Sequence, residues 1–373
     1  MRKSCNWIAS ILLSALVAAV ALREGPAPSA SPVEADPASR SAIERRFLGE
    51  PVRITDGMTK AGEGYFSADA RRICYQAVPP GHPFYRIYIQ DFDATAPRPA
   101  PPRQVSPGPG RTTCSWFSPA GARLLFASSH LDPEVGATEA AARAQAEDDA
   151  RSGRRRRYQW DFDPWMDIFS SRLDGSDLVQ LTATKGYDAE CSFSPDGRQV
   201  LFVSDRDGDP DIYVMDADGA NVQQLTDVPG YDGGPFFSPD AKRICYRSDR
   251  NKDNLLQVFI ADLVFDKDGS ITGIANEQQL TSNEHVNWCP FFRPDGKTLV
   301  YGTSEIGHRN YEIFELVIPA DMTTAPVRRR VTEAEGADVL PAFSPDGKWL
   351  LWTGQRNEGK VSQLFVGHYR DQP

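Results

Sequence analysis

A short phrase returns six times along the chain and limits the folds that the chain can adopt. Each copy joins an aromatic core residue to a turn signal, and the copies are YFSADA at 65, WFSPAG at 116, SFSPDG at 192, FFSPDA at 236, FFRPDG at 291 and AFSPDG at 342. Their phenylalanines are separated by 51, 76, 44, 55 and 51 residues, so a basic unit of about 45 residues carries insertions in some copies. A repeat of this period is typical of an array of similar supersecondary units.

The cleanest unit predicts four β-strands. Residues 191–226, CSFSPDGRQVLFVSDRDGDPDIYVMDADGANVQQLT, contain four short runs of β-branched and aromatic residues separated by Pro, Asp and Gly. Such runs indicate strands, and such separators indicate tight turns. In Ser-Pro-Asp-Gly, Pro fixes φ at the second position and Gly accepts the left-handed conformation that closes a hairpin. The unit is therefore predicted to be a four-stranded antiparallel sheet.

Six such sheets arranged radially predict an all-β fold, a six-bladed β-propeller. The last unit has only three strands, whereas EPVRITDG at 50–57 is an isolated outer strand that matches the QQLT at the end of another unit. We expect this N-terminal strand to complete the last blade and to protect the edges that an open ring would expose. Residues 50–373 are thus predicted to form one closed domain.

The N-terminus has the pattern of a targeting segment. Arg2 and Lys3 precede the apolar run WIASILLSALVAAVAL, and Ala19-Val20-Ala21 fits the small-x-small cleavage pattern. We predict a signal peptide over residues 1–21 and a periplasmic or otherwise extracytoplasmic mature chain that is not inserted in a membrane. An uncleaved anchor is the alternative, because tilting or bilayer thinning accommodates a short apolar run. Residues 22–49, rich in Pro, Ala and Ser, are predicted to be a flexible linker.

Charge and cysteine content exclude several classes of protein. The formal net charge of -10 argues against nucleic-acid binding, which needs a basic face. The five cysteines after the cleavage site fall in strands of five different units, without the spacing of a metal site, and their odd number argues against a full disulfide framework. We expect buried thiols, no cofactor and a monomer.

A long insertion at about residues 132–165 interrupts the second unit between its second and third strands. Its alanine-rich centre, with Glu139 four residues before Arg143, favours a helix. Strands alternate in direction, so this loop leaves on the same face as the loops that lead into the innermost strands. We therefore expect the insertion to lie at one mouth of the central channel.

Acidic residues recur at the start of the innermost strands. Five positions before each phenylalanine stand Ala61, Thr112, Asp188, Asp232, Asn287 and Asp338. Three positions before it stand Glu63, Cys114, Glu190, Gly234, Cys289 and Leu340. Innermost strands line the channel, so the carboxylates are expected to converge on one mouth and to attract a cation, a peptide amino terminus or basic side chains. The predicted binding residues are Asp188, Asp232, Asn287, Asp338, Glu63 and Glu190. The alternative is a structural role, in which these groups cap strand starts and bind water.

Metal and catalytic signatures are weak. His82, His130, His285 and His308 are all expected on the channel-mouth face, and three histidines around one cation would make a metal site, but they belong to no ligand motif. DRDGDPD at 205–211 resembles a calcium loop but lacks the glutamate at the twelfth position, so we predict a hairpin turn. The sequence also lacks nucleophile-elbow, zinc-helix and phosphate-loop motifs. We therefore predict neither a metal site nor a catalytic residue.

The segment SPDGRQVLFVSDRDGDPDIYVMDADGANVQQLT is similar to the repeat of TolB-like six-bladed propellers, and the likeness covers nearly all of residues 50–373. More narrowly, AGEGYFSADARRICYQAV, RYQWDFDPWMDIF and GYDGGPFFSPDAKRICYR resemble exported bacterial TolB-like proteins, some of which carry a C-terminal zinc aminopeptidase-like domain. We expect neither that domain nor the N-terminal α/β domain of TolB in this chain. The resemblance implies a channel mouth that receives a partner peptide.

Three functions follow. The leading hypothesis is an exported, non-enzymatic propeller that binds a protein or peptide partner at its acidic channel mouth, in envelope transport or scaffolding. The second is a propeller enzyme, a lyase or hydrolase acting on sugars, which requires His130, His285 and His308 to approach one another. The third is an accessory domain of a separately encoded peptidase.

Overall fold

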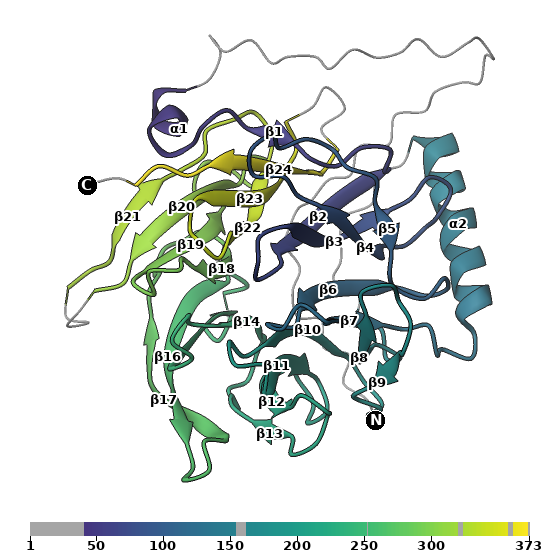
Figure 1. Cartoon of the computed structure of the whole chain (residues 1–373). Coiled ribbons are helices and arrows are strands. Elements are labelled where there is room, and N and C mark those ends of the chain that lie inside the picture. The colour runs from purple at the N-terminus through teal and green to yellow at the C-terminus, as the bar shows by residue number, and fades with distance from the viewer. Residues whose placement is uncertain (1–40, 154–161, 252, 320–323, 357–360, 372–373) are drawn as a thin grey trace.

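Six four-stranded antiparallel sheets surround a central axis in the computed structural model (Figure 1), which describes residues 41–153, 162–251, 253–319, 324–356 and 361–371. The predicted six-bladed β-propeller is confirmed. The predicted signal peptide and the linker up to residue 40 lie outside the described residues.

Five blades are each built from four consecutive strands, the innermost named first. Blade 1 contains β2 (Lys60–Phe66), β3 (Arg72–Val78), β4 (Arg86–Asp91) and β5 (Arg103–Gln104). Blade 2 contains β6 (Thr112–Phe117), β7 (Arg123–Ser128), β8 (Asp167–Arg172) and β9 (Val179–Gln180). Blade 3 contains β10 (Asp188–Phe193), β11 (Gln199–Ser204), β12 (Asp211–Asp216) and β13 (Gln223–Gln224). Blade 4 contains β14 (Asp232–Phe237), β15 (Arg243–Ser248), β16 (Gln257–Phe265) and β17 (Ile271–Gln279). Blade 5 contains β18 (Asn287–Phe292), β19 (Thr298–Thr303), β20 (Glu312–Val317) and β21 (Val327–Arg330).

The sixth blade is made from both ends of the described chain. It contains β22 (Asp338–Phe343), β23 (Trp349–Gly354), β24 (Gln363–His368) and, as its outer strand, β1 (Val52–Arg53). The partners across the closing pair are Val52 with Val366 and Arg53 with Phe365. The expected closure by the N-terminal strand is therefore confirmed.

The folded domain begins earlier than the sequence predicts. Helix α1 (Ala42–Phe47) lies within the expected linker, and its N-cap Ser41 accepts a hydrogen bond from the Glu44 N–H at 3.0 Å. Phe47 and Leu48 are buried in an apolar cluster with residues of the last two blades. This short segment is thus part of the packed domain, because it supplies apolar side chains to a cluster shared by the last two blades.

The repeated turn has the predicted geometry. In blade 3, Ser194 Oγ donates to Asp196 Oδ1 at 2.6 Å and accepts the Gln199 N–H at 3.0 Å, while Gly197 has a φ of 73°. Ala70 and Ala241 replace that glycine in two blades and still take positive φ values of 52° and 56°. The turn is therefore imposed by the hairpin even where the sequence offers no glycine.

A second repeated contact ties the third strand of each blade to its outer strand. A threonine or serine hydroxyl accepts the N–H of the second residue of the third strand at 2.9–3.0 Å, and these hydroxyls belong to Ser106, Thr182, Thr226, Thr281, Thr332 and Thr55. In the last blade, Thr55 also donates to Gln363 Oε1 at 2.7 Å. The N-terminal strand therefore brings to the last blade the same hydroxyl that the other blades obtain locally.

Replacing Thr55 by valine keeps the shape of the side chain and removes both hydrogen bonds, leaving the Gln363 Oε1 and the Leu364 N–H buried without partners. We expect the free energy of unfolding to fall by about 1–3 kcal/mol. Denaturant titration measures this fall, and Thr59→Val, at the exposed threonine directly before β2, serves as control. Equal midpoints for the two variants would contradict the role given to Thr55.

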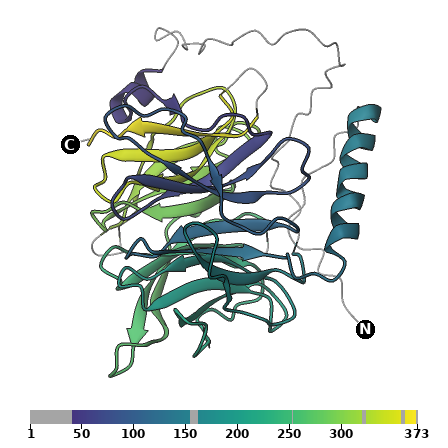
Figure 2. The same ribbon diagram turned by 45° about the vertical axis from the view of Figure 1, so that its right-hand side comes forward.

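The insertion contains the expected helix, α2 (Val135–Ser152), which has no buried residue. Figure 2 shows it standing beside the sheets. Glu139 attaches it to the propeller: this carboxylate accepts hydrogen bonds from Arg86 Nη2 at 2.7 Å and from the Gly110 N–H at 3.1 Å. Arg86 is 1% exposed and stands where the other blades carry Asp, Glu or Gln. No helix in the described part of the chain is both long and apolar enough to cross a bilayer.

Because, in the described structure, Glu139 joins α2 to the buried Arg86 and to the Gly110 N–H, Glu139→Ala is expected to release the helix without unfolding the blades. Short helices that lose their tertiary contacts fray in water. We expect the α2 amides to exchange their hydrogens at least about tenfold faster, with the blade strands unchanged. Hydrogen exchange read by mass spectrometry tests this, with Glu147→Ala, at an exposed position of the same helix, as control. Unchanged protection of α2 would show that another contact holds it.

Candidate binding site in the central channel

The three aspartates of the predicted site are buried ion-pair partners. Asp188, Asp232 and Asp338 are at most 1% exposed. Each forms an ion pair with an arginine that follows the second strand of the same blade. The pairs are Arg206 with Asp188 at 3.2 Å, Arg250 with Asp232 at 2.9 Å and Arg356 with Asp338 at 2.5 Å. The charge of these carboxylates is thus matched within the blade.

These side chains lie at the seams between blades. Asn287, at the equivalent position, donates its Nδ2 hydrogen to Gln257 Oε1 of blade 4 at 3.0 Å. Burial raises the pKa of Asp232 to about 6, although Arg250 opposes the shift. Asp167 of blade 2 lies near Asp188 of blade 3, where these two blades meet. Burial, and to a smaller degree the charge of Asp188, raises the pKa of Asp167 to about 6. The structure therefore corrects the expectation that Asp188, Asp232, Asn287 and Asp338 face the channel mouth.

The reason for the difference is a β-bulge in every innermost strand. The pairing register shifts near the residue three positions before the phenylalanine. That residue has a φ between 48° and 59° in all six blades: Glu63, Cys114, Glu190, Gly234, Cys289 and Leu340. A bulge re-aims the side chains on either side of it, so simple alternation along the strand does not give their direction.

The bulge residues, unlike the aspartates, meet inside the ring. Glu63 of blade 1 has Cys114 of blade 2 and Glu190 of blade 3 among its close electrostatic neighbours, together with Arg247 of blade 4. The structure thus brings together two of the six predicted site residues, Glu63 and Glu190. Arg247, which sequence reasoning missed, could have been found as the only charged residue among the second-strand positions that face the bulges.

Glu190 is fully neutralised. It is 7% exposed and accepts hydrogen bonds from Tyr231 Oη at 2.8 Å, from the Gly234 N–H at 2.6 Å and from Arg247 Nη2 at 2.8 Å. A Cβ on Gly234 would lie 2.2 Å from Arg247 Nη1. Glycine is therefore required at that bulge, because the guanidinium occupies the space where a side chain would begin.

Glu63 has hydrogen-bond donors but no cationic partner. Gln76 Nε2 donates to it at 2.8 Å and Tyr65 Oη at 3.4 Å, and within the described ranges no lysine or arginine lies within 4.0 Å of its carboxylate. Burial, and to a smaller degree Glu190, raises the pKa of Glu63 to about 7. Arg247 opposes this shift without forming an ion pair with Glu63. Glu63 is thus a half-buried residue whose carboxylate accepts hydrogen bonds from neutral side chains only.

Four aromatic rings fill the channel below this polar layer. Tyr65, Trp116, Phe236 and Phe291 come from four blades, and their ring centroids lie 4.7–6.1 Å apart. On their far side, the same rings and the prolines of the repeated turns line a depression of about 300 Å³. The rings therefore separate the polar layer from the face that carries the Ser-Pro-Asp-Gly turns.

The end of the insertion covers part of the opposite mouth. Phe162 packs on Tyr187 with ring centroids 5.0 Å apart and contacts the buried cluster that contains Tyr231 and Trp288. Asp163 next to it forms an ion pair with Arg111 at 3.2 Å. Phe162 and Asp163, at the end of the insertion, therefore lie against the ring of innermost strands, whereas α2 stands beside the sheets.

The histidines do not assemble. His130 Nδ1 lies 3.0 Å from Ser128 Oγ and its ring centroid lies 4.5 Å from that of Phe169, whereas His308 lies beside Tyr311. Across the described parts of the chain, no histidine belongs to a group of three candidate metal ligands. The geometry that the enzyme hypothesis requires of His130, His285 and His308 is not found.

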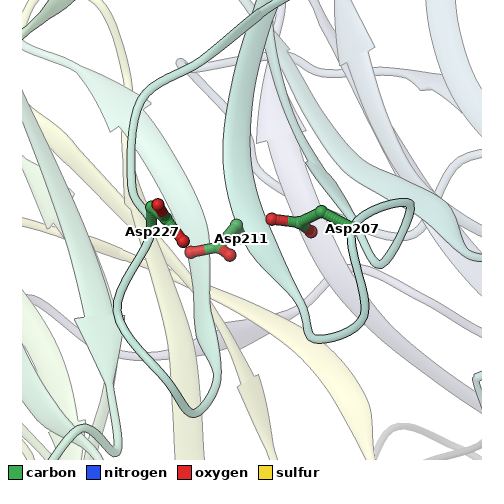
Figure 3. A group of neighbouring side chains, drawn as sticks. All are labelled: Asp207, Asp211 and Asp227. Atoms are coloured by element: carbon green, nitrogen blue, oxygen red, sulfur yellow. The ribbon is translucent and has the colours of Figure 1, made fainter.

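One acidic group lies outside the channel (Figure 3). Asp207, Asp211 and Asp227 have carboxylate oxygens within 4.8 Å of one another at the seam of blades 3 and 4. The segment 205–211 is the predicted hairpin turn, between β11 and β12. Gln224 Nε2 donates to Asp207 at 2.6 Å and to Asp211 at 3.4 Å. Burial raises the pKa of Asp211 to about 7. The Asp211 carboxyl is therefore partly protonated near neutral pH, and hydrogen bonds hold the group together.

A comparison with protein families matches residues 161–227 to the family described as TolB beta propeller domain. No curated protein matches the sequence.

Solved structures show the same fold at low sequence identity. TolB from Acinetobacter baumannii aligns with a TM-score of 0.53 at 20% identity, over 82% of this chain and 65% of that one. A protein assigned as TolB from Agrobacterium tumefaciens aligns with a TM-score of 0.54 at 17% identity, over 88% of this chain and 99% of that one. Oligogalacturonate lyase from Vibrio parahaemolyticus aligns with a TM-score of only 0.46 at 12% identity, over 82% of this chain and 76% of that one.

The raised pKa of Glu63 predicts a pH dependence of stability. Between pH 4.5 and about 7 the unfolded chain loses this proton and the native protein keeps it, so the free energy of unfolding falls with rising pH. Relative to Glu63→Gln, the wild type should lose about 3 kcal/mol over this range and then stay level. Denaturant titrations at several pH values measure the difference, with Glu284→Gln, at an exposed acid, as control. A difference that does not change with pH would show that Glu63 has an ordinary pKa.

Proposed function

We propose that this TolB-like six-bladed β-propeller is exported and binds a protein or peptide partner, without catalysis, at the acidic mouth of its central channel. The observation that carries the proposal is Glu63, a half-buried channel residue whose carboxylate accepts hydrogen bonds from Gln76 and Tyr65 and has no cationic partner within 4.0 Å in the described structure. A buried or half-buried charge is costly unless it is paired, so a positively charged ligand would stabilise this arrangement.

The six predicted residues take different parts in this proposal. Glu63 contacts the ligand, and Glu190 holds Arg247 and Tyr231 in place beside it. Asp188, Asp232, Asn287 and Asp338 act from the seams, where they fix the relative position of neighbouring blades. Their removal would then weaken binding through the shape of the channel mouth.

The shape of the mouth favours the end of an extended segment. Aromatic rings fill the channel on one side of the polar layer, and Phe162 packs against buried residues of several blades. Such a site admits one chain end or one long side chain rather than a folded surface. The net charge of -10 would attract a basic partner from a distance, with a dependence on salt.

The family match and the apolar N-terminal run support export, and the fold likeness to TolB supports a role in envelope transport or scaffolding. Neither likeness identifies a specific partner for this chain. The partner is therefore defined here by chemistry, as a basic chain end or side chain.

The test is affinity capture from an envelope extract of the source cells with the mature wild-type protein, Glu63→Gln and Glu284→Gln. We expect a partner that is retained by the wild type and by Glu284→Gln, is at least about tenfold depleted with Glu63→Gln, and is released by salt. Circular dichroism confirms that each variant is folded.

Retention of the same partner by Glu63→Gln would refute the channel as the binding site. A stoichiometric metal in the purified protein, with turnover of an oligosaccharide, would instead favour the propeller enzyme. A peptidase captured independently of Glu63 would favour the accessory domain.

A further inference from the structure

We infer that the channel receives a primary ammonium group, carried by the amino terminus or by a lysine side chain of the partner. This inference rests on the proposed function and names the chemistry that the site selects.

The first argument is the distribution of charge. The polar layer contains two carboxylates and one guanidinium, and the guanidinium of Arg247 is committed to Glu190 at 2.8 Å and to Tyr231 Oη at 2.6 Å. Glu63 is left with neutral donors, the amide of Gln76 and the hydroxyl of Tyr65. The layer therefore contains one more carboxyl group than guanidinium groups, and a bound cation would pair with Glu63 in its ionised form.

The second argument is an unused acceptor next to that carboxylate. Gln76 turns its Nε2 hydrogens toward Glu63 Oε2 at 2.8 Å, which leaves its Oε1 buried and without a hydrogen-bond partner in the described structure. Buried polar atoms are almost always hydrogen-bonded, so an orphaned carbonyl oxygen points to a donor that binds there. Glu63 and Gln76 together offer acceptors to a single N–H-rich cation.

The third argument concerns the kind of cation. An ammonium group has three donors on one small centre, whereas a guanidinium has five in a rigid plane. Two acceptor side chains and an aromatic floor that includes Tyr65 suit the smaller group, because a guanidinium would leave donors unpaired. Aromatic faces also attract ammonium ions. At the rim of blade 1, Lys60 already places its ammonium nitrogen 4.5 Å from the centroid of the Tyr85 ring.

A bare metal ion fits the same site less well. Neither Glu63 nor Glu190 belongs to a group of three candidate ligands in the described residues. The cysteine beside them does not supply a thiolate, because burial raises the pKa of Cys114 well above its usual range. An organic ammonium needs only hydrogen-bond acceptors, which are present.

The experiment uses three small probes on the mature protein labelled with ¹³C in its glutamate carboxyls. The probes are Ala-Ala-Ala amide, its N-acetylated form and Nα-acetyl-lysine amide, so the two sources of an ammonium are tested separately. The Glu63 resonance is assigned as the one lost in Glu63→Gln. We expect at least one ammonium probe to shift this resonance and to lower the pKa of Glu63 from about 7, while N-acetylated Ala-Ala-Ala amide does neither.

Two variants locate the site. Glu63→Gln and Gln76→Met should each weaken binding of the active probe about tenfold, since each removes an acceptor of a charged donor. Glu284→Gln, at an exposed acid, should bind like the wild type. If Gln76→Met fails to fold, the comparison of acetylated with free peptide on the wild type still tests whether binding requires an ammonium group.

A response to Ala-Ala-Ala amide alone would assign the ligand as a chain terminus, and a response to Nα-acetyl-lysine amide alone would assign it as a lysine. Equal responses to the free and acetylated peptides, or none up to about 20 mM, would overturn the inference, since an ion pair of this kind supports binding near about 1 mM. If capture of the partner depends on Glu63 while the probes fail, the ammonium is wrong and the channel function stands. If capture does not depend on Glu63, the channel function itself falls.

Discussion

Closure of the ring is the constraint on which the rest of this structure depends. Six blades leave one open seam unless the outer strand of the last blade is supplied from the other end of the domain, and β1 does this by pairing with β24. Thr55 reproduces there the hydroxyl contact found in every other blade. Only a closed ring holds the innermost strands at fixed distances around the axis, and the channel chemistry requires those distances.

Within the closed ring, the six bulges decide which charges face the channel. Residues five positions before each phenylalanine are buried in the seams, where arginines neutralise the three charged ones. Residues at the bulge turn inward, and there the protein supplies one guanidinium for two carboxylates. The three aspartates at these strand starts are therefore paired, whereas Glu63 in the channel forms no ion pair in the described structure. This difference distinguishes the candidate binding residue from the structural ion pairs.

Much of the architecture could be predicted from sequence, because turn chemistry and hydrophobic alternation repeat six times and each copy supports the others. The blade number, the closure by residues 50–57 and the helix in the insertion all follow from such local signals. The direction of the acidic side chains does not, since a bulge adds one residue to a strand without a distinctive sequence. Even so, the arginines Arg206, Arg250 and Arg356 each stand 18 residues after their aspartate, and this recurring spacing was a readable signal of the ion pairs. The ion pair of Glu139 with Arg86 joins segments of two blades, and no recurring spacing in the sequence indicates it.

The measurement that tests the account most directly is a titration of the Glu63 carboxyl in the free protein by ¹³C NMR. The account predicts a midpoint near 7, because the carboxylate is enclosed beside Glu190 without a cation of its own. A midpoint near 4.5, the ordinary value for glutamate, would contradict it. The charge of Glu63 would then already be solvated or paired in the free protein, and a positively charged ligand would gain little by binding there.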